Sequence, residues 1–314
     1  MKTLSLPSRL RSITRRINNK IESVVGDIIR KYSDHEPHIL FDIVSERLRQ
    51  SVLHSKESGV SSETYFPDRQ LIVSLTTYGK RLFEVYLAIE SIMQQTCKPN
   101  RIILWIGEEL QNERLPHTLL LQQERGLEIK YCRDIRSYTK LIPALREFPD
   151  DVIVTIDDDV IYHYDMLEEM LHTSLRSPDS IVCNRYHKMT LWPDGTLRPY
   201  MEWEIECKSD EASVLCFPTG VGGVLYPPKS LADEVLNEDV FMKLCPYADD
   251  VWFKAMALLK GTSCQPVCQQ IHRTMYIDIP SNRSTLLDYN VIAGGNNKAI
   301  GAVFSHYRLI PFKP

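Results

Sequence analysis

The sequence has no long apolar run. None of its 314 residues lies in a stretch approaching the roughly 18 consecutive apolar residues that a membrane-spanning helix needs. The N-terminus also lacks the apolar core of a secretory signal peptide. The eight cysteines follow no repeating framework, which is typical of reduced thiols rather than of a disulfide scaffold. We therefore expect a protein that stays in the cytoplasm.

Low complexity and internal repeats are also absent. Hydrophobic residues make up 43% of the chain and charged residues 25%, which is ordinary for a soluble globular protein and excludes a disordered or fibrous chain. The length suits one large domain, or one and a half, with a core of normal size.

Basic charge is concentrated at the N-terminus. Residues 1–31 contain eight basic and two acidic residues, a net charge of +6, so with −4 overall the remainder of the chain carries −10. Apolar residues recur there at steps of three and four, which predicts an amphipathic helix; they are Leu10, Ile13, Ile17, Ile21, Val24 and Ile28. Such a segment fits either the surface of an anionic membrane or a place on the body of the same protein. Nucleic acid is not expected as a partner, because no stacking aromatics are interleaved with the basic residues.

The rest of the chain alternates between strand-like and helix-like segments. Residues 1–69 form a basic helical region and a linker, and a catalytic domain is expected over residues 70–314. Such alternation predicts βαβ units, hence an α/β fold with a mostly parallel sheet. Strands are expected at 71–75, 101–106, 127–132 and 152–156, with helices at 81–95, 116–125, 139–147 and 249–259.

Three consecutive carboxylates, Asp157, Asp158 and Asp159, end the apolar strand DVIVTI. Ligands of open α/β sheets bind outside the carboxyl ends of the strands, where this cluster would lie. Alternation puts Asp157 and Asp159 on one side, so that both could reach one hard cation and its phosphates. An acidic turn before the helix that starts near Asp165 is the structural alternative.

Several motifs in order resemble those of a known enzyme family. They are SLTTYGKR, LAIESIMQQTCKPNRIILWI, the strand ending in DDD, GVGGVLYPP and ADDVW. Over about residues 70–280 the sequence resembles GT-A fold glycosyltransferases, most of all bacterial family 2 type enzymes. The stretch TKLIPAL…TIDDDV also resembles the C-terminal domain of exostosins. The resemblance implies a Rossmann-like, mostly parallel central sheet flanked by helices, with residues 1–69 as an N-terminal helical extension.

The resemblance also implies roles for the aspartates. Asp157 would lie near the ribose and the metal, and Asp159 would coordinate the Mn²⁺ or Mg²⁺ that bridges the diphosphate of a nucleotide sugar. Asp158 would point away and support the nucleotide-sugar site from behind. A late histidine, His272 or its rival His306, would be a third metal ligand.

Further residues are expected to bind the donor. The resemblance places the base and phosphates near Thr76, Thr77, Tyr78 and Arg81, where the alternative is a turn with a threonine cap. Lys140 would face the diphosphate, unless it is a solvated lysine on a helix.

A glycine-rich stretch comes later in the chain. Gly222 and Gly223, together with Gly220, would let the backbone approach the sugar closely, or would only form a bend.

A second pair of carboxylates, Asp249 and Asp250, begins a helix in CPYADDVWFKAMALL. The resemblance assigns Asp250 as the base that deprotonates the acceptor and Asp249 as a ligand of an acceptor hydroxyl. The alternative is a pair that interacts with the helix dipole. A zinc site made of Cys264, Cys268 and His272 is not expected, because Gly261 and Pro266 favour a strand there.

The resulting hypothesis is a metal-dependent hexosyl- or N-acetylhexosaminyltransferase. It would move a sugar from a nucleotide sugar, UDP being the commonest carrier, to a saccharide or lipid-linked saccharide in bacterial surface polysaccharide synthesis. ADDVW favours inversion, whereas the exostosin-like features favour retention. A sugar nucleotidyltransferase is the rival enzyme, and a non-catalytic saccharide-binding protein is the rival outside enzymology.

Overall fold

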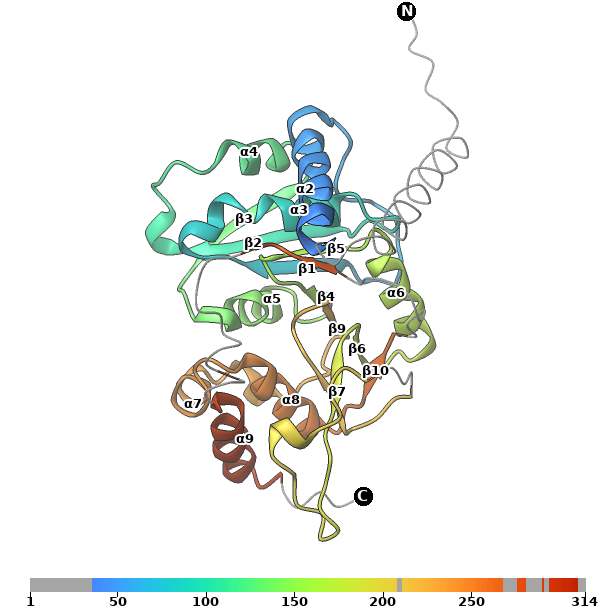
Figure 1. Ribbon diagram of the computed structural model, residues 1–314, viewed down its shortest axis with the longest axis vertical. Helices are drawn as coiled ribbons and strands as arrows, with labels where there is room; N and C mark the ends of the chain where they lie inside the picture. Colours follow the sequence, from blue (N-terminus) through green and yellow to red (C-terminus); the bar gives the residue numbers. More distant parts are fainter. Residues whose placement is uncertain (1–35, 208–210, 268–275, 281–289, 291–293, 310–314) are drawn as a thin grey trace, which may run out of the picture.

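The computed structural model describes residues 36–207, 211–267, 276–280, 290 and 294–309. Its centre is a seven-stranded sheet in the order β10-β6-β9-β4-β1-β2-β3 (Figure 1). All strands run parallel except β9, which is antiparallel to β4 and β6. In chain order the strands are β1 Leu71–Thr76, β2 Arg101–Gly107, β3 Leu127–Cys132, β4 Val152–Thr155, β6 Ile181–Cys183, β9 Val224–Tyr226 and β10 Cys264–Pro266. The predicted α/β fold with a mostly parallel sheet is thus confirmed.

Helices cover both faces of this sheet. In Figure 1, α2, α3 and α4 lie above the sheet, and α5, α7, α8 and α9 lie below it. The helices are α2 Glu36–His54, α3 Tyr86–Met93, α4 His117–Gln123, α5 Ile142–Glu147, α6 Met166–Arg176, α7 Glu238–Leu244, α8 Asp249–Lys260 and α9 Gly295–His306. Short 3₁₀ helices are η1 Gly79–Phe83, η2 Glu108–Leu110, η3 Arg136–Lys140, η4 Tyr200–Glu202 and η5 Asp233–Leu236. No helix among the described residues combines the length and apolar character that a bilayer span requires.

Two pairs of three-residue strands complete the structure. β5 Val160–Tyr162 pairs with β11 Tyr276–Asp278, directly after the aspartate triplet. β7 Tyr186–Lys188 pairs with β8 Cys216–Pro218.

The sheet has an apolar core on each face. Leu71, Val73 and Leu75 of β1 pack on the side of α3, whereas Ile72 packs on the side of α8. β1, β2 and β4 are buried on both faces, so their sequences are nearly continuous apolar runs. β3 lies at the edge of the sheet, is only partly buried, and alternates apolar residues with Glu128 and Lys130. The sequence predicted all four strands within one or two residues of their observed ends.

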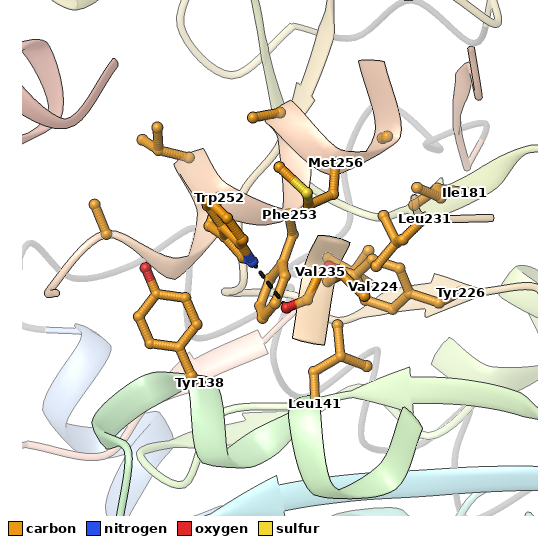
Figure 2. Packing of buried hydrophobic residues seen from close by; sticks show 14 of the residues in the cluster. Tyr138, Leu141, Ile181, Val224, Tyr226, Leu231, Val235, Trp252, Phe253 and Met256 are labelled. Carbon is orange, nitrogen blue, oxygen red and sulfur yellow. Dashed lines mark hydrogen bonds between the residues drawn. The ribbon is translucent and has the colours of Figure 1, made fainter. Parts of the chain in front are cut away.

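The core below the sheet fixes η3 against α8. Figure 2 shows Tyr138 and Leu141 facing Trp252, Phe253 and other side chains of this cluster. Tyr138 stacks on Phe241 with ring centroids 4.1 Å apart. The Trp252 indole N–H donates a hydrogen bond to the carbonyl of Val235 at 3.0 Å, so that the buried indole is satisfied. Lys140 and the start of α8 are therefore positioned by packing next to them.

Several helices differ from their predicted extents. The helix expected at 81–95 begins as η1 and continues as α3, and the helix expected at 139–147 begins as η3 and continues as α5. Helix α2 is the part of the expected N-terminal extension that the structure describes. It packs against α3, and its Leu48 and Val52 are buried. The predicted amphipathic helix within residues 1–31 lies outside the described residues. The expected strand around residue 264 is observed as β10.

The segment expected to be a linker lies against the domain. The Tyr65 hydroxyl donates to the carbonyl of Lys98 at 2.8 Å, and the Arg125 guanidinium donates to the carbonyl of Glu57 at 2.8 Å. These bonds attach the chain between α2 and β1 to the segments that lead into β2 and β3.

A buried ion pair joins the helices above the sheet. Arg125 donates to both carboxylate oxygens of Glu90 at 3.0 and 2.8 Å, and Ser51 of α2 donates to the same carboxylate at 2.7 Å. Both charged side chains are almost fully buried. Loss of one partner would therefore leave an uncompensated buried charge.

We expect Arg125→Met to lower the free energy of unfolding by about 3–5 kcal/mol, measured by urea denaturation. Arg49→Met, which removes an exposed ion pair with Glu46 on α2, is the matched control and should leave the transition unchanged. Equal effects of the two substitutions would contradict this role of the Glu90–Arg125 pair.

Candidate active site

The aspartate triplet lies between β4 and β5, at the carboxyl end of the central strand. The side chains of Asp157 and Asp159 are 25% and 32% exposed, whereas that of Asp158 is 7% exposed. Asp157 and Asp159 therefore reach solvent while Asp158 points inward. The sequence analysis expected this order from an extended segment, whereas Asp158 and Asp159 lie in a turn between β4 and β5. The backbone N–H of Asp157 donates to the hydroxyl of the buried Tyr162 at 2.8 Å, a contact for which the sequence offered no signal.

Residues after β1 hold the inward aspartate. Thr77 donates from its hydroxyl to Asp158 at 2.6 Å, and Arg81 of η1 donates to Asp158 at 2.9 Å. The other terminal nitrogen of Arg81 lies 3.0 Å from Asp159 Oδ2. One guanidinium thus bridges two neighbouring carboxylates, and the loop after β1 is fixed to the loop after β4.

Two further residues of the first loop differ in their surroundings. Thr76 donates its hydroxyl to the carbonyl of Trp105 at 3.0 Å, so that it is tied to β2. Tyr78 is 60% exposed, and the centroid of its ring lies 5.6 Å from Cζ of Arg81. Tyr78 is therefore an exposed aromatic residue beside the arginine that contacts the aspartate triplet.

Lys140 connects the two groups of carboxylates. Its side chain is 8% exposed, and Nζ lies 2.9 Å from Asp157 Oδ1 and 3.1 Å from Asp249 Oδ2. Burial lowers the pKa of Lys140, but attraction to Asp157, Asp249 and Asp250 outweighs burial and raises it well above its usual value. Lys140 is therefore a buried cation and not the solvated lysine considered as the alternative.

The second carboxylate pair begins α8. The backbone N–H of Gly220 donates to Asp250 Oδ2 at 3.1 Å. Asp249 Oδ2 contacts the Lys140 charge but has no hydrogen bond of good geometry. Burial and repulsion from Asp249 raise the pKa of Asp250 to about 7, with Lys140 opposing the shift.

Gly220 is the glycine that faces the carboxylates. A Cβ atom at this position would lie 2.6 Å from Lys140 Nζ, 3.3 Å from Asp250 Oδ1 and 3.5 Å from Asp157 Oδ1. Any side chain here would displace the lysine, which gives Gly220 a packing requirement that its motif alone did not reveal.

The other two glycines form the bend. Gly222 and Gly223 have positive φ angles of 95° and 94°, and the Gly223 N–H donates back to the carbonyl of Gly220 at 3.1 Å. Their missing side chains face Asn184 and Met166, and not the carboxylates. The bend that was the alternative for this motif is present.

Negative charge exceeds positive charge at this site. Among the described residues, the five carboxylates of Asp157, Asp158, Asp159, Asp249 and Asp250 share two cationic partners, Arg81 and Lys140. Burial and the neighbouring Asp157 raise the pKa of Asp159 to about 6, against the opposing effect of Arg81. The site would therefore gain stability from an added cation or from a proton.

The donors of this site suit a hard divalent cation. Mg²⁺ uses one or two protein carboxylates together with phosphates and water, and Asp157 and Asp159 offer two partly exposed carboxylates. Within the described part of the chain, no group of three or more His, Cys, Asp or Glu side chains is arranged to hold a metal. His272 and Cys268 lie outside the described residues. His306 is exposed in the last turn of α9, where its ring contacts Tyr307.

Two solved structures are distant likenesses of this chain. No protein-family model and no curated protein matches this chain. Among solved structures, it is similar to CMP:2-keto-3-deoxy-manno-octonic acid synthetase complexed with CTP, with 9% identity, 63% of this chain and 88% of the other covered, and a TM-score of 0.37. It is also similar to HddC from Yersinia pseudotuberculosis, with 12% identity, 51% and 78% coverage and a TM-score of 0.33. Likenesses at this level carry no conclusion about activity.

The raised pKa of Asp250 predicts a pH-dependent stability. Between about pH 4, where an unfolded aspartate ionises, and pH 7, the folded state retains a proton that the unfolded state has lost. The contribution of Asp250 to the free energy of unfolding is therefore fully present below about pH 4 and is lost as the pH rises through about 7. Asp250→Asn should raise the melting temperature more at pH 8 than at pH 5, measured without divalent cations. An equal or smaller gain at pH 8 would contradict the raised pKa.

Proposed function

We propose that this protein is a metal-dependent glycosyltransferase that uses a nucleotide sugar, with the carboxylate site as its active centre. The observation that carries the proposal is the meeting of two carboxylate groups from distant segments around one buried lysine, with more acids than cations. A purely structural cluster would gain nothing from such an excess of like charge, whereas a site for a cation and a polar substrate would use it.

The residues around the aspartate triplet are proposed to bind the donor. Asp159 is the more exposed carboxylate and is the proposed main metal ligand, with Asp157 beside it. Arg81 donates to Asp158 and Asp159 but has further N–H groups available for the donor phosphates. Tyr78 offers an exposed ring on which a nucleotide base could stack. Mg²⁺ or Mn²⁺, when bound, supplies the charge neutralisation that a departing nucleoside diphosphate requires.

Asp250 is the proposed general base. A pKa of about 7 suits a group that must accept a proton near neutral pH. The Gly220 N–H fixes one oxygen of Asp250, and Asp249 is proposed to orient the acceptor hydroxyl. Proton removal by Asp250 as the hydroxyl attacks the anomeric carbon corresponds to an inverting reaction. In a retaining, exostosin-like reaction, Asp250 would have no such role.

The proposed acceptor and the competing reaction are those that the sequence motifs indicated. The proposed acceptor is a saccharide or lipid-linked saccharide of bacterial surface polysaccharide synthesis, with a UDP-sugar as donor. A sugar nucleotidyltransferase would use similar donor-binding carboxylates but would release pyrophosphate instead of a nucleoside diphosphate. A general base within the second carboxylate pair, Asp250, favours glycosyl transfer, because a sugar phosphate attacking a nucleotide is already ionised and needs no base.

The first functional prediction concerns Asp159. Asp159→Ala should abolish the binding of UDP in the presence of Mn²⁺, because the proposed cation loses its main protein ligand. Isothermal titration calorimetry measures this, and the melting temperature serves as the control for folding. Asp165→Ala, next to the same loop, is a matched acidic substitution that should leave UDP affinity unchanged. Unchanged UDP affinity in Asp159→Ala would remove this residue from the metal site.

The second prediction separates chemistry from binding. Asp250→Asn should keep donor affinity within a few-fold but lower kcat by roughly 10²-fold or more, the usual scale for loss of a general base. The readout is the rate of UDP release with acceptor present, in parallel with calorimetric titration of UDP and Mn²⁺. If the variant retains most of its turnover, Asp250 is not the base and a retaining reaction gains support.

A further inference from the structure

A groove lies apart from the carboxylate site, between α2, α3 and the segment that follows β11. Its volume is about 450 Å³. Phe41, Tyr86, Leu87 and Ile279 give it an apolar lining, and Asp42 and Glu84 stand among them. The groove thus combines apolar surface with negative charge.

The acidic residues of this groove differ in their partners. Glu46 and Arg49 of α2 also line the groove, and their opposite charges pair with each other. Asp42 and Glu84 are exposed, and within the described residues neither forms an ion pair. Two carboxylates are therefore available at the groove for a basic partner.

We propose that this groove binds the basic N-terminal segment of the same chain, residues 1–31. The segment carries a net charge of +6 and a predicted apolar stripe, which complement the two kinds of surface in the groove. Its last residue, Lys31, is only a few positions before α2, whose first half contributes Phe41 and Asp42 to the groove. A short connection of this kind gives an effective concentration on the order of millimolar, so that weak contacts suffice.

Charge also favours this occupant over an anionic membrane. The chain outside residues 1–31 carries a net charge of −10 and would be repelled by the lipid surface that attracts the segment. Docking on the acidic groove, in contrast, brings opposite charges together within one molecule.

The groove is linked to the carboxylate site through the backbone. Ile279, which lines the groove, donates its N–H to the carbonyl of Asp159 at 2.8 Å. A segment bound on Ile279 would therefore stabilise the hydrogen bond between the residue after β11 and the backbone of Asp159. This inference does not depend on the proposed reaction, because the binding can be measured without activity.

Limited trypsin digestion of the full-length protein tests the proposal. Cleavage after Arg15, Arg16 and Lys20 is followed by mass spectrometry at low salt and at about 1 M salt, where the Debye length falls to about 3 Å. Docking predicts that cleavage at low salt is slower than at high salt by about tenfold, the scale expected from two screened ion pairs. The salt comparison on the wild-type chain decides the question even if a variant fails to fold.

Charge reversal provides the second measurement. Asp42→Lys/Glu84→Lys should be cleaved rapidly at both salt concentrations. Glu113→Lys/Asp179→Lys makes the same change of charge at two exposed sites that do not line the groove, and should behave like the wild type. Equal cleavage rates at low salt in the wild type and the groove variant would overturn the proposal.

Vesicles of anionic phospholipid test the competing occupant. The groove variant, with its segment released, should pellet with vesicles at low salt more strongly than the matched control variant. If the two variants and the wild type pellet equally, the segment is already free to bind lipid, and the proposal is wrong.

Discussion

The contact of Lys140 with two aspartates is the interaction on which the site depends. Asp157 follows β4 and Asp249 begins α8, and these two carboxylates would repel each other if a cation did not lie between them. Lys140 Nζ, 2.9 and 3.1 Å from their oxygens, holds the two segments together. The lysine itself is fixed from the strand side, because the Ser74 hydroxyl of β1 donates to its carbonyl at 2.6 Å. One buried residue thus joins β1, through its carbonyl, to the end of β4 and the start of α8, through its ammonium group.

The surrounding structure provides the room and the rigidity that this arrangement requires. Gly220 passes so close to Lys140 Nζ that a methyl group would displace the ammonium. Tyr138 of η3 and Trp252 of α8 pack into one core cluster and fix η3 and α8 relative to the sheet (Figure 2). A substitution far from any substrate, such as one at Tyr138, would therefore act on the site by moving Lys140.

Much of the fold could be predicted from the sequence, for a physical reason. β1, β2 and β4 are buried on both faces, so their apolar runs are visible in the sequence. Asp158 is buried and its two neighbours are partly exposed, but Asp158 and Asp159 lie in a turn, which the extended segment assumed from the sequence did not include. In contrast, β5 and β11 are three residues long and have no periodic pattern to detect. The polar sequence of α2 concealed a helix that buries only a few residues such as Leu48 and Val52.

The site was predicted residue by residue but not as an arrangement. Lys140 and Asp249 are more than a hundred positions apart, and only the crossovers of the sheet bring them together. The sequence could not show that Gly220, rather than Gly222 or Gly223, faces the carboxylates, because all three belong to one motif. The contact of Arg81 with Asp158 and Asp159 likewise depends on β1 and β4 being neighbours in the sheet.

The two carboxylate groups are proposed to serve the transfer of a sugar from a nucleotide sugar. The most direct measurement is a screen of nucleotide sugars for release of the nucleoside diphosphate, with and without Mn²⁺, with nucleoside triphosphates plus sugar phosphates tested in parallel for release of pyrophosphate. The account predicts metal-dependent release of a nucleoside diphosphate from at least one nucleotide sugar and no pyrophosphate. Pyrophosphate release without cleavage of any nucleotide sugar would contradict it and identify a nucleotidyltransferase instead.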